Sequence, residues 1–139
     1  MARERGRVAW RRAFWAYAVA LFTVSHWPAA RLPPMVIERP DLIVHVALFA
    51  GWSFLLTRTG YLGRPGSWRA SLLVLPVALA YAGIDEALQA VPVLRRTAVW
   101  SDAMANCAGV ILGVMLGRAV PAAPGRGGAG EPDRAWGTR

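Results

Sequence analysis

The chain has 139 residues, of which 55% are hydrophobic, and its 16 basic residues against 8 acidic ones give a formal net charge of +8. This length allows one domain, and the gathering of the apolar residues into four blocks argues against an ordinary soluble domain. All the basic residues are arginines at the borders of the apolar blocks, a placement typical of a membrane protein and not of a nucleic-acid-binding protein. A single cysteine, Cys107, excludes an intrachain disulfide and a cysteine-based metal site.

The first apolar block runs from about Ala13 to Trp27 and follows a stretch rich in arginine. A basic start before a short apolar core is also typical of a cleaved signal peptide. Bulky aromatic residues inside the block, and the interruption of any cleavage site by Trp27 and Pro28, favour a helix that is retained in the membrane.

Three further apolar blocks run from about Leu42 to Thr57, Ala70 to Val91 and Ala103 to Val120. At about 1.5 Å per residue, blocks of roughly 16 to 22 residues extend about 24–33 Å, close to the thickness of a hydrocarbon core. The first two blocks are short and need flanking residues or local thinning of the bilayer to span it. The sequence therefore predicts an all-α polytopic membrane domain over residues 1–120, with four transmembrane helices.

The placement of the arginines predicts the orientation in the cell membrane. With the N-terminus inside, the outer loops hold only Arg31, Arg39, Arg95 and Arg96, and the other arginines lie on the inner side. This bias predicts a multi-pass protein with both termini in the cytoplasm. Residues 121–139, rich in Gly, Pro and Ala, are expected to form a disordered cytoplasmic tail.

Small residues recur every fourth position along the last block: Ala105, Gly109, Gly113 and Gly117. Such a stripe lets another helix approach closely. We expect it to pack within the molecule, in preference to forming a dimer interface.

Polar residues four positions apart interrupt the second, third and fourth blocks: Asp41 with His45, Asp85 with Gln89, and Asp102 with Asn106. A spacing of four places both members on one helix face. A charge inside an apolar helix costs about 2.5–3.5 kcal/mol on insertion scales, so these residues should face the protein interior. The predicted topology puts all three pairs at the outer level, below the loop that carries Arg95 and Arg96, and this predicts one shared polar site.

Simpler interpretations of the same residues stay open. Asp41 and Asp102 suit the first turns of helices, and Gln89 and Asn106 suit interhelical hydrogen bonding. Asp85 and Glu86 are adjacent and point about 100° apart, so at least one of them must face the interior. Arg95 or Arg96 is suited to pair with one of these acids. A purely structural polar core is the alternative to a binding site.

The joint order of these motifs resembles the VanZ-like family, membrane proteins named for a member associated with teicoplanin resistance. The resemblance is carried by Asp41-Leu-Ile-Val-His45, Ile84-Asp85-Glu86-Ala-Leu-Gln89, the arginine-containing loop and Ser101-Asp102-Ala-Met-Ala-Asn106-Cys-Ala-Gly109, and it covers about Ala13 to Gly117. It implies a four-helix membrane protein. The loop after Gln89 reads Val-Pro-Val-Leu-Arg-Arg-Thr where the family more often has a compact Pro-Gly-Arg turn, which leaves open which arginine faces the site.

The first functional hypothesis is a non-enzymatic envelope protein whose outer polar site binds a lipid-linked or cell-wall-related headgroup, with a link to glycopeptide resistance. Membrane lipids are the other expected partners, and no nucleic acid, cofactor or resident metal is expected. The candidate ligand-binding residues are Asp41, His45, Asp85, Glu86, Gln89, Arg95, Arg96, Asp102 and Asn106.

The alternative is an intramembrane hydrolase or transferase that acts on a lipid headgroup, with Asp85 or Glu86 as general base assisted by His45. In a variant of this hypothesis, Asp41, His45, Glu86 and Asp102 ligate a divalent metal. Transport or proton relay ranks last, because the polar residues stop in the outer third of the helices.

Overall fold

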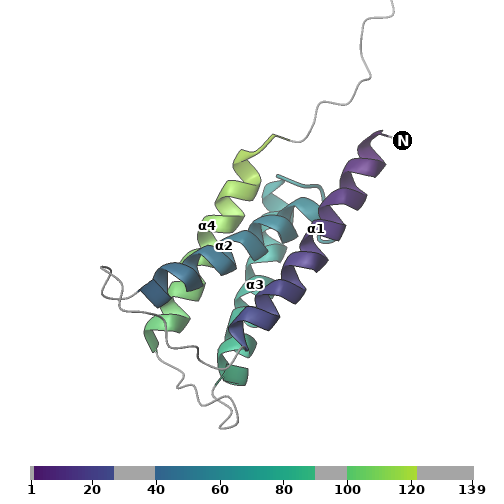
Figure 1. Ribbon diagram of the computed structural model, residues 1–139. Coiled ribbons are helices and arrows are strands. Elements are labelled where there is room, and N and C mark those ends of the chain that lie inside the picture. The colour runs from purple at the N-terminus through teal and green to yellow at the C-terminus, as the bar shows by residue number, and fades with distance from the viewer. Residues whose placement is uncertain (1, 27–39, 90–99, 122–139) are drawn as a thin grey trace, which may run out of the picture.

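The computed structural model describes residues 2–26, 40–89 and 100–121. In these ranges the chain is all-helical, as predicted, with α1 (Ala2–Ser25), α2 (Pro40–Thr59), α3 (Trp68–Gln89) and α4 (Trp100–Ala119). The helices lie side by side in one bundle (Figure 1), in which α2 and α4 make the most extensive contact. Residues 90 and 91 of the third predicted block and residues 122–139 of the predicted tail lie outside the described residues.

The helix boundaries follow from local chemistry. Pro40 is the first residue of α2, a position at which the backbone N–H that proline lacks would have no partner within the helix. Gly60 follows the last residue of α2 with a φ of 71°, the left-handed conformation that glycine adopts without strain. Ser67 caps α3, because its Oγ accepts the backbone N–H of Ala70 at 3.2 Å. The helix α1 begins at Ala2, ahead of the apolar block that starts near Ala13, since the basic stretch consists largely of arginine and alanine, which are good helix formers.

Three helices, α2, α3 and α4, are long and apolar enough to cross a membrane. Much of their apolar surface faces outward, with exposed side chains that include Ile43, Leu72, Val77, Ile84, Ile111 and Met115. A soluble helix bundle would turn such residues toward its core. In α1 the arginines occupy the first half, which leaves a shorter apolar stretch before Ser25.

The glycine stripe of α4 lies directly against α2. A Cβ atom built on Gly109 would stand 2.5 Å from the carbonyl oxygen of Val46, and one built on Gly117 would stand 2.8 Å from Cβ of Thr57. At Gly113 the added atom would overlap the carbonyl oxygen of Ala50 and Oγ of Ser53. The expected close packing within the molecule is therefore confirmed.

Aromatic side chains join the other helices to this pair. Trp52 of α2 stacks on Tyr81 of α3, with ring centroids 4.5 Å apart and planes inclined by 10°. Phe14 of α1 packs on the same indole at 5.4 Å, and Tyr17 Oη donates to the carbonyl of Leu48 at 3.0 Å. The centre of the bundle is thus an aromatic contact of α1, α2 and α3 beside the glycine crossing.

A buried arginine closes the end of the bundle that holds the N-terminus of α1. Arg58 donates through Nη1 to the carbonyls of Gly117 (3.3 Å) and Val120 (2.6 Å), and through Nη2 to that of Pro121 (3.2 Å). Its guanidinium also lies 5.4 Å from the ring centroid of Trp10. These bonds satisfy carbonyls at the C-terminal end of α4 that have no partner within the helix, and the positive charge complements the helix dipole.

Substitution of Gly113 by alanine should destabilise the bundle, because the added methyl group has no room at the α2–α4 crossing. We expect a loss of about 1–3 kcal/mol, typical of overpacking, seen as a lower midpoint of thermal unfolding by circular dichroism in mild detergent. Gly83→Ala on α3 is the matched control, since nothing lies within 4 Å of a Cβ there. The control should be neutral or stabilising by up to about 1 kcal/mol. Equal midpoints for the two variants would contradict the close crossing.

Candidate polar site at one end of the bundle

The polar pairs predicted from the sequence gather at one end of the bundle. Figure 1 shows that α1 and α3 end there and that α2 and α4 begin there. Asp41 and His45 lie in the first turns of α2, Asp102 and Asn106 in those of α4, and Asp85 and Gln89 in the last turns of α3. The end of the bundle that carries Asp85, His45 and Asn106 is called the acidic end below.

A fully buried carboxylate forms the centre of the first polar group, which joins α1 to α3. The Oδ1 atom of Asp85 accepts a hydrogen bond from Ser25 Oγ at 2.9 Å, and its Oδ2 atom accepts one from Gln89 Nε2 at 2.7 Å. The aspartate is only 1% exposed. A carboxylate removed from water is stable when donors occupy its oxygens, and here both oxygens are occupied.

His26 extends this first group. Its Nδ1 atom lies 2.9 Å from the carbonyl oxygen of Phe22, 3.0 Å from Ser25 Oγ and 3.8 Å from Asp85 Oδ1. Because a carbonyl oxygen only accepts, the proton is on Nδ1. The imidazole also stacks on the ring of Phe22, with centroids 4.1 Å apart.

The second polar group joins α2 to α4 through His45. Its Nδ1 atom lies 2.9 Å from Oδ1 of Asn106, and its Nε2 atom lies 3.8 Å from Oδ2 of Asp102. Asp102 also accepts a hydrogen bond from Ser101 Oγ at 3.2 Å. One imidazole thus contacts both members of the pair on α4, as their spacing of four residues requires.

The remaining predicted residues either lie at the same end or fall outside the described residues. Asp41 and Glu86 are partly buried, and Asp85 is the member of the adjacent acidic pair that faces the interior. Arg95 and Arg96 lie outside the described residues. The contacts of the described side chains therefore form two groups, and the first of them includes α1, which the sequence interpretation left out.

Ser25 and His26 were missed by sequence reasoning, although a signal was present. His26 is one of only two histidines in the chain, and the two residues end an apolar block at the predicted outer level. Ser25 and its partner Asp85 are 60 positions apart in the sequence. No helical periodicity links residues at such a separation, so the sequence does not predict their contact.

Each group contains one buried polar atom without a hydrogen-bond partner among the described residues. These atoms are Nε2 of His26 and Nδ2 of Asn106, and Asn106 is fully buried. Trp52 Nε1 and Arg58 Nε share this property elsewhere in the bundle. Nδ2 of Asn106 is a donor, and an unsatisfied buried donor costs about 1–3 kcal/mol, which a bound acceptor group would recover. Nε2 of His26, with the proton on Nδ1, is an acceptor.

The described residues do not assemble a metal site. Within ranges 2–26, 40–89 and 100–121, no group of three or more His, Cys, Asp or Glu side chains is arranged to hold a metal ion. The metal-binding variant with Asp41, His45, Glu86 and Asp102 therefore has no support from the geometry of these side chains.

Comparisons with models of protein families, with curated proteins and with solved structures found no match. The resemblance to the VanZ-like family thus rests on the order of the motifs in this sequence.

Substitution of Ser25 by alanine tests whether the first group joins α1 to α3. The variant removes a donor from a buried carboxylate, so we expect a loss of about 1–3 kcal/mol in the free energy of unfolding, measured by thermal denaturation of the detergent-solubilised chain. Thr23→Ala is the control, since Thr23 is exposed and its Oγ1 donates only within α1, to the carbonyl of Val19 at 2.8 Å. A change within about 0.5 kcal/mol is expected for the control. The link would be refuted by equal losses in the two variants.

Proposed function

We propose that this chain is a VanZ-like integral membrane protein with four membrane-spanning helices and an outer polar site that binds the headgroup of a cell-envelope lipid or a lipid-linked cell-wall precursor. The observation that carries the proposal is the pair of hydrogen-bonded polar groups, buried at one end of a bundle whose outer faces are apolar. Polar side chains at such a position are costly and are more often retained for function than for packing.

The distribution of charge supports the orientation. Exposed arginines lie at the end of the bundle opposite the acidic end, on α1, in the turn between α2 and α3, in the first turn of α3 and at the end of α4: Arg5, Arg7, Arg12, Arg64, Arg69 and Arg118. Cytoplasmic segments of membrane proteins carry this excess of positive charge. The acidic end then faces outward, and both termini are cytoplasmic.

The fourth span is α1. Its apolar half packs into the bundle through Phe14 and Leu21, both buried, while Val19 and Phe22 face outward. The basic first half extends beyond this apolar stretch and places its arginines in the inner headgroup layer. The apolar half of α1 packs against α2, and bilayer thinning together with snorkelling of the arginines allows this short stretch to span.

The chemistry of the site favours a ligand rich in hydroxyl and amide groups. Its described side chains are carboxylates, imidazoles, amides and hydroxyls, which donate to and accept from sugars and peptides. Arg95 and Arg96, in the loop that follows α3 in the sequence, add the guanidinium groups that recognise phosphate. A glycosylated or peptide-bearing headgroup on a lipid phosphate combines these features.

Binding is favoured over the intramembrane hydrolase or transferase that sequence reasoning left open. Both oxygens of Asp85 already accept hydrogen bonds, from Ser25 and Gln89, so this carboxylate is committed as an acceptor. His45 contacts Asp102 and Asn106 of α4, and these contacts do not assist Asp85 as the general base of the enzyme hypothesis. The unsatisfied Nδ2 of Asn106 instead provides a buried donor for a ligand oxygen.

Cysteine labelling tests the topology. In a Cys107→Ala background, Arg64→Cys should react with a membrane-impermeant maleimide only after the cells are permeabilised, and Thr97→Cys should react in intact cells. The proposed topology puts the two positions on opposite sides of the membrane, and permeabilised cells provide the control for reactivity. The reverse pattern would place the acidic end in the cytoplasm and overturn the proposed orientation.

Asn106→Leu tests the site, because it keeps the volume of the side chain and removes its hydrogen-bonding groups. Fluorescent polyprenyl diphosphate carrying a disaccharide-pentapeptide is titrated into the detergent-solubilised chain. We expect saturable binding by the natural sequence and affinity weakened about 10-fold or more in the variant, equivalent to about 1.4 kcal/mol. Met104→Leu, at an exposed position two residues earlier on α4, is the matched control.

The same variants test the link to glycopeptides. In a glycopeptide-sensitive Gram-positive host, the natural sequence and Met104→Leu should lower susceptibility to teicoplanin, and Asn106→Leu should not, at equal amounts of protein in the membrane. Unchanged susceptibility with intact precursor binding would remove the resistance link and leave the binding site. Binding that is equal in all three proteins would show that Asn106 belongs to a structural polar core.

A further inference from the structure

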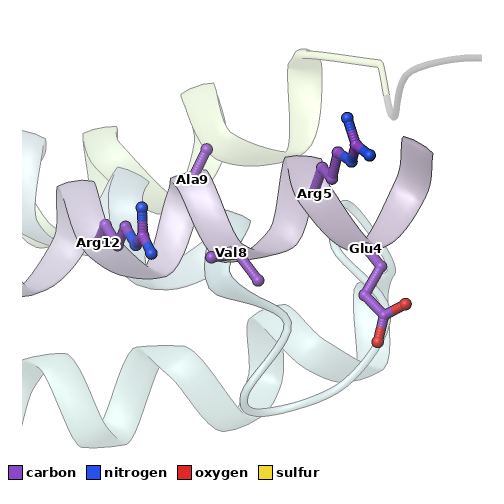
Figure 2. A pocket seen from close by; sticks show the side chains of 5 residues that line it. All are labelled: Glu4, Arg5, Val8, Ala9 and Arg12. Carbon is purple, nitrogen blue, oxygen red and sulfur yellow. The ribbon is translucent and has the colours of Figure 1, made fainter. Parts of the chain in front are cut away.

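The strongest candidate for a second site lies at the opposite end of the bundle, on the first half of α1. A shallow depression there is lined by Glu4, Arg5, Val8, Ala9 and Arg12, all from one helix (Figure 2). Arg5 and Arg12 are seven residues apart, which separates them by two turns, or about 10.5 Å along the axis, on the same face. Val8 and Ala9 lie between them, and Glu4 points away from Arg5 (Figure 2).

The helix face that carries these arginines continues without interruption into an apolar surface. At alternating steps of three and four residues it presents Arg5, Val8, Arg12, Trp15, Val19 and Phe22, all of them exposed. The order along the helix is charge, then an indole ring, then aliphatic and aromatic side chains. A phospholipid has the same order, with a phosphate, an interfacial region and acyl chains.

The opposite side of α1 is fixed to α2, so the outward face is presented rigidly. Arg11 Nε donates to the carbonyl of Thr59 at 3.2 Å, and its guanidinium lies 4.7 Å from the ring centroid of Tyr61. Trp15 Nε1 donates to Tyr61 Oη at 3.1 Å, which fixes the indole ring on the outward face. A site held in this way loses little conformational freedom when it binds.

The charge around this face is almost entirely positive. Arg7 on α1, Arg64 and Arg69 near the start of α3, and Arg118 at the end of α4 are exposed at the same end of the bundle (Figure 1). Among the described residues, Glu4 is the one acid at this end. An anionic surface is therefore attracted, and a zwitterionic one is not.

We propose that this face of α1 binds an anionic phospholipid of the inner leaflet. Arg5 and Arg12 hold the headgroup phosphate, and Trp15, Val19 and Phe22 contact the acyl chains. Guanidinium groups bind phosphate oxygens in pairs, which makes arginine better suited to this role than lysine. The inference rests on the proposed insertion of α1 in the membrane, and it assigns α1 a partner distinct from the ligand of the acidic end.

Native mass spectrometry of the full chain in mild detergent tests the inference. With equal amounts of phosphatidylglycerol and phosphatidylcholine, we expect the complex with phosphatidylglycerol to predominate by about 10-fold. Arg5→Gln/Arg12→Gln should abolish this preference. Arg126→Gln/Arg134→Gln, which removes the same charge from positions outside the described residues, should retain it. Equal loss in the two double variants would overturn the inference, because net charge alone would then explain the preference.

Two further arms complete the experiment. Arg5→Lys/Arg12→Lys keeps the charge that sets the orientation, and its preference for phosphatidylglycerol should lie between those of the natural sequence and the glutamine variant. Inorganic phosphate at millimolar concentration should not displace the lipid, and displacement would overturn the assignment to a lipid in favour of a soluble anion. Labelling at positions 64 and 97 separates the two proposals: normal topology without lipid preference contradicts only this inference, whereas abnormal topology contradicts the proposed function.

Discussion

The close crossing of α2 and α4 is the contact on which the rest of the bundle depends. In a lipid environment, apolar side chains gain little by leaving the lipid for another helix, so helices associate through tight packing and hydrogen bonds. Gly109, Gly113 and Gly117 bring the backbone of α4 against α2. The Oγ atom of Ser53 comes within 3.1 Å of the carbonyl oxygen of Val110, so a hydrogen bond supplements the packing at the centre of the crossing.

Polar contacts close this helix pair at both ends. At one end Arg58 binds the terminal carbonyls of α4, and at the other His45 contacts Asp102 and Asn106. The two ends differ in chemical consequence. The guanidinium of Arg58 binds backbone carbonyls that the end of any helix leaves without a hydrogen-bond partner. The side chains of His45 and Asn106 bind each other and satisfy no backbone group among the described residues, so their burial has no such backbone role. The acidic end is therefore the better candidate for function.

The sequence predicted the parts of the structure that are governed by local periodicity. The stripe at Gly109 and Gly113 and the facing members of each polar pair follow from the geometry of a single helix. The contact between Ser25 and Asp85 could not be predicted, because it depends on how α1 docks against α3. The extension of α1 to Ala2 does not follow from hydropathy, because hydropathy locates only the apolar block, whereas helix propensity carries the helix into the arginine-rich stretch before it.

The two ends of α1 differ in their chemistry. Its last turn supplies Ser25 to the buried carboxylate of the acidic end, and its first turns present Arg5 and Arg12 at the opposite end. Asp85 receives its donors from α1 and α3, so the position of α1 along the axis of the bundle fixes the first polar group. In the proposed orientation, the arginines lie among inner headgroups while Ser25 donates to a buried aspartate, so the same helix is restrained at two points. In that orientation, a shift of α1 that improved one of these contacts would strain the other, and this would limit the depth of the bundle in the membrane.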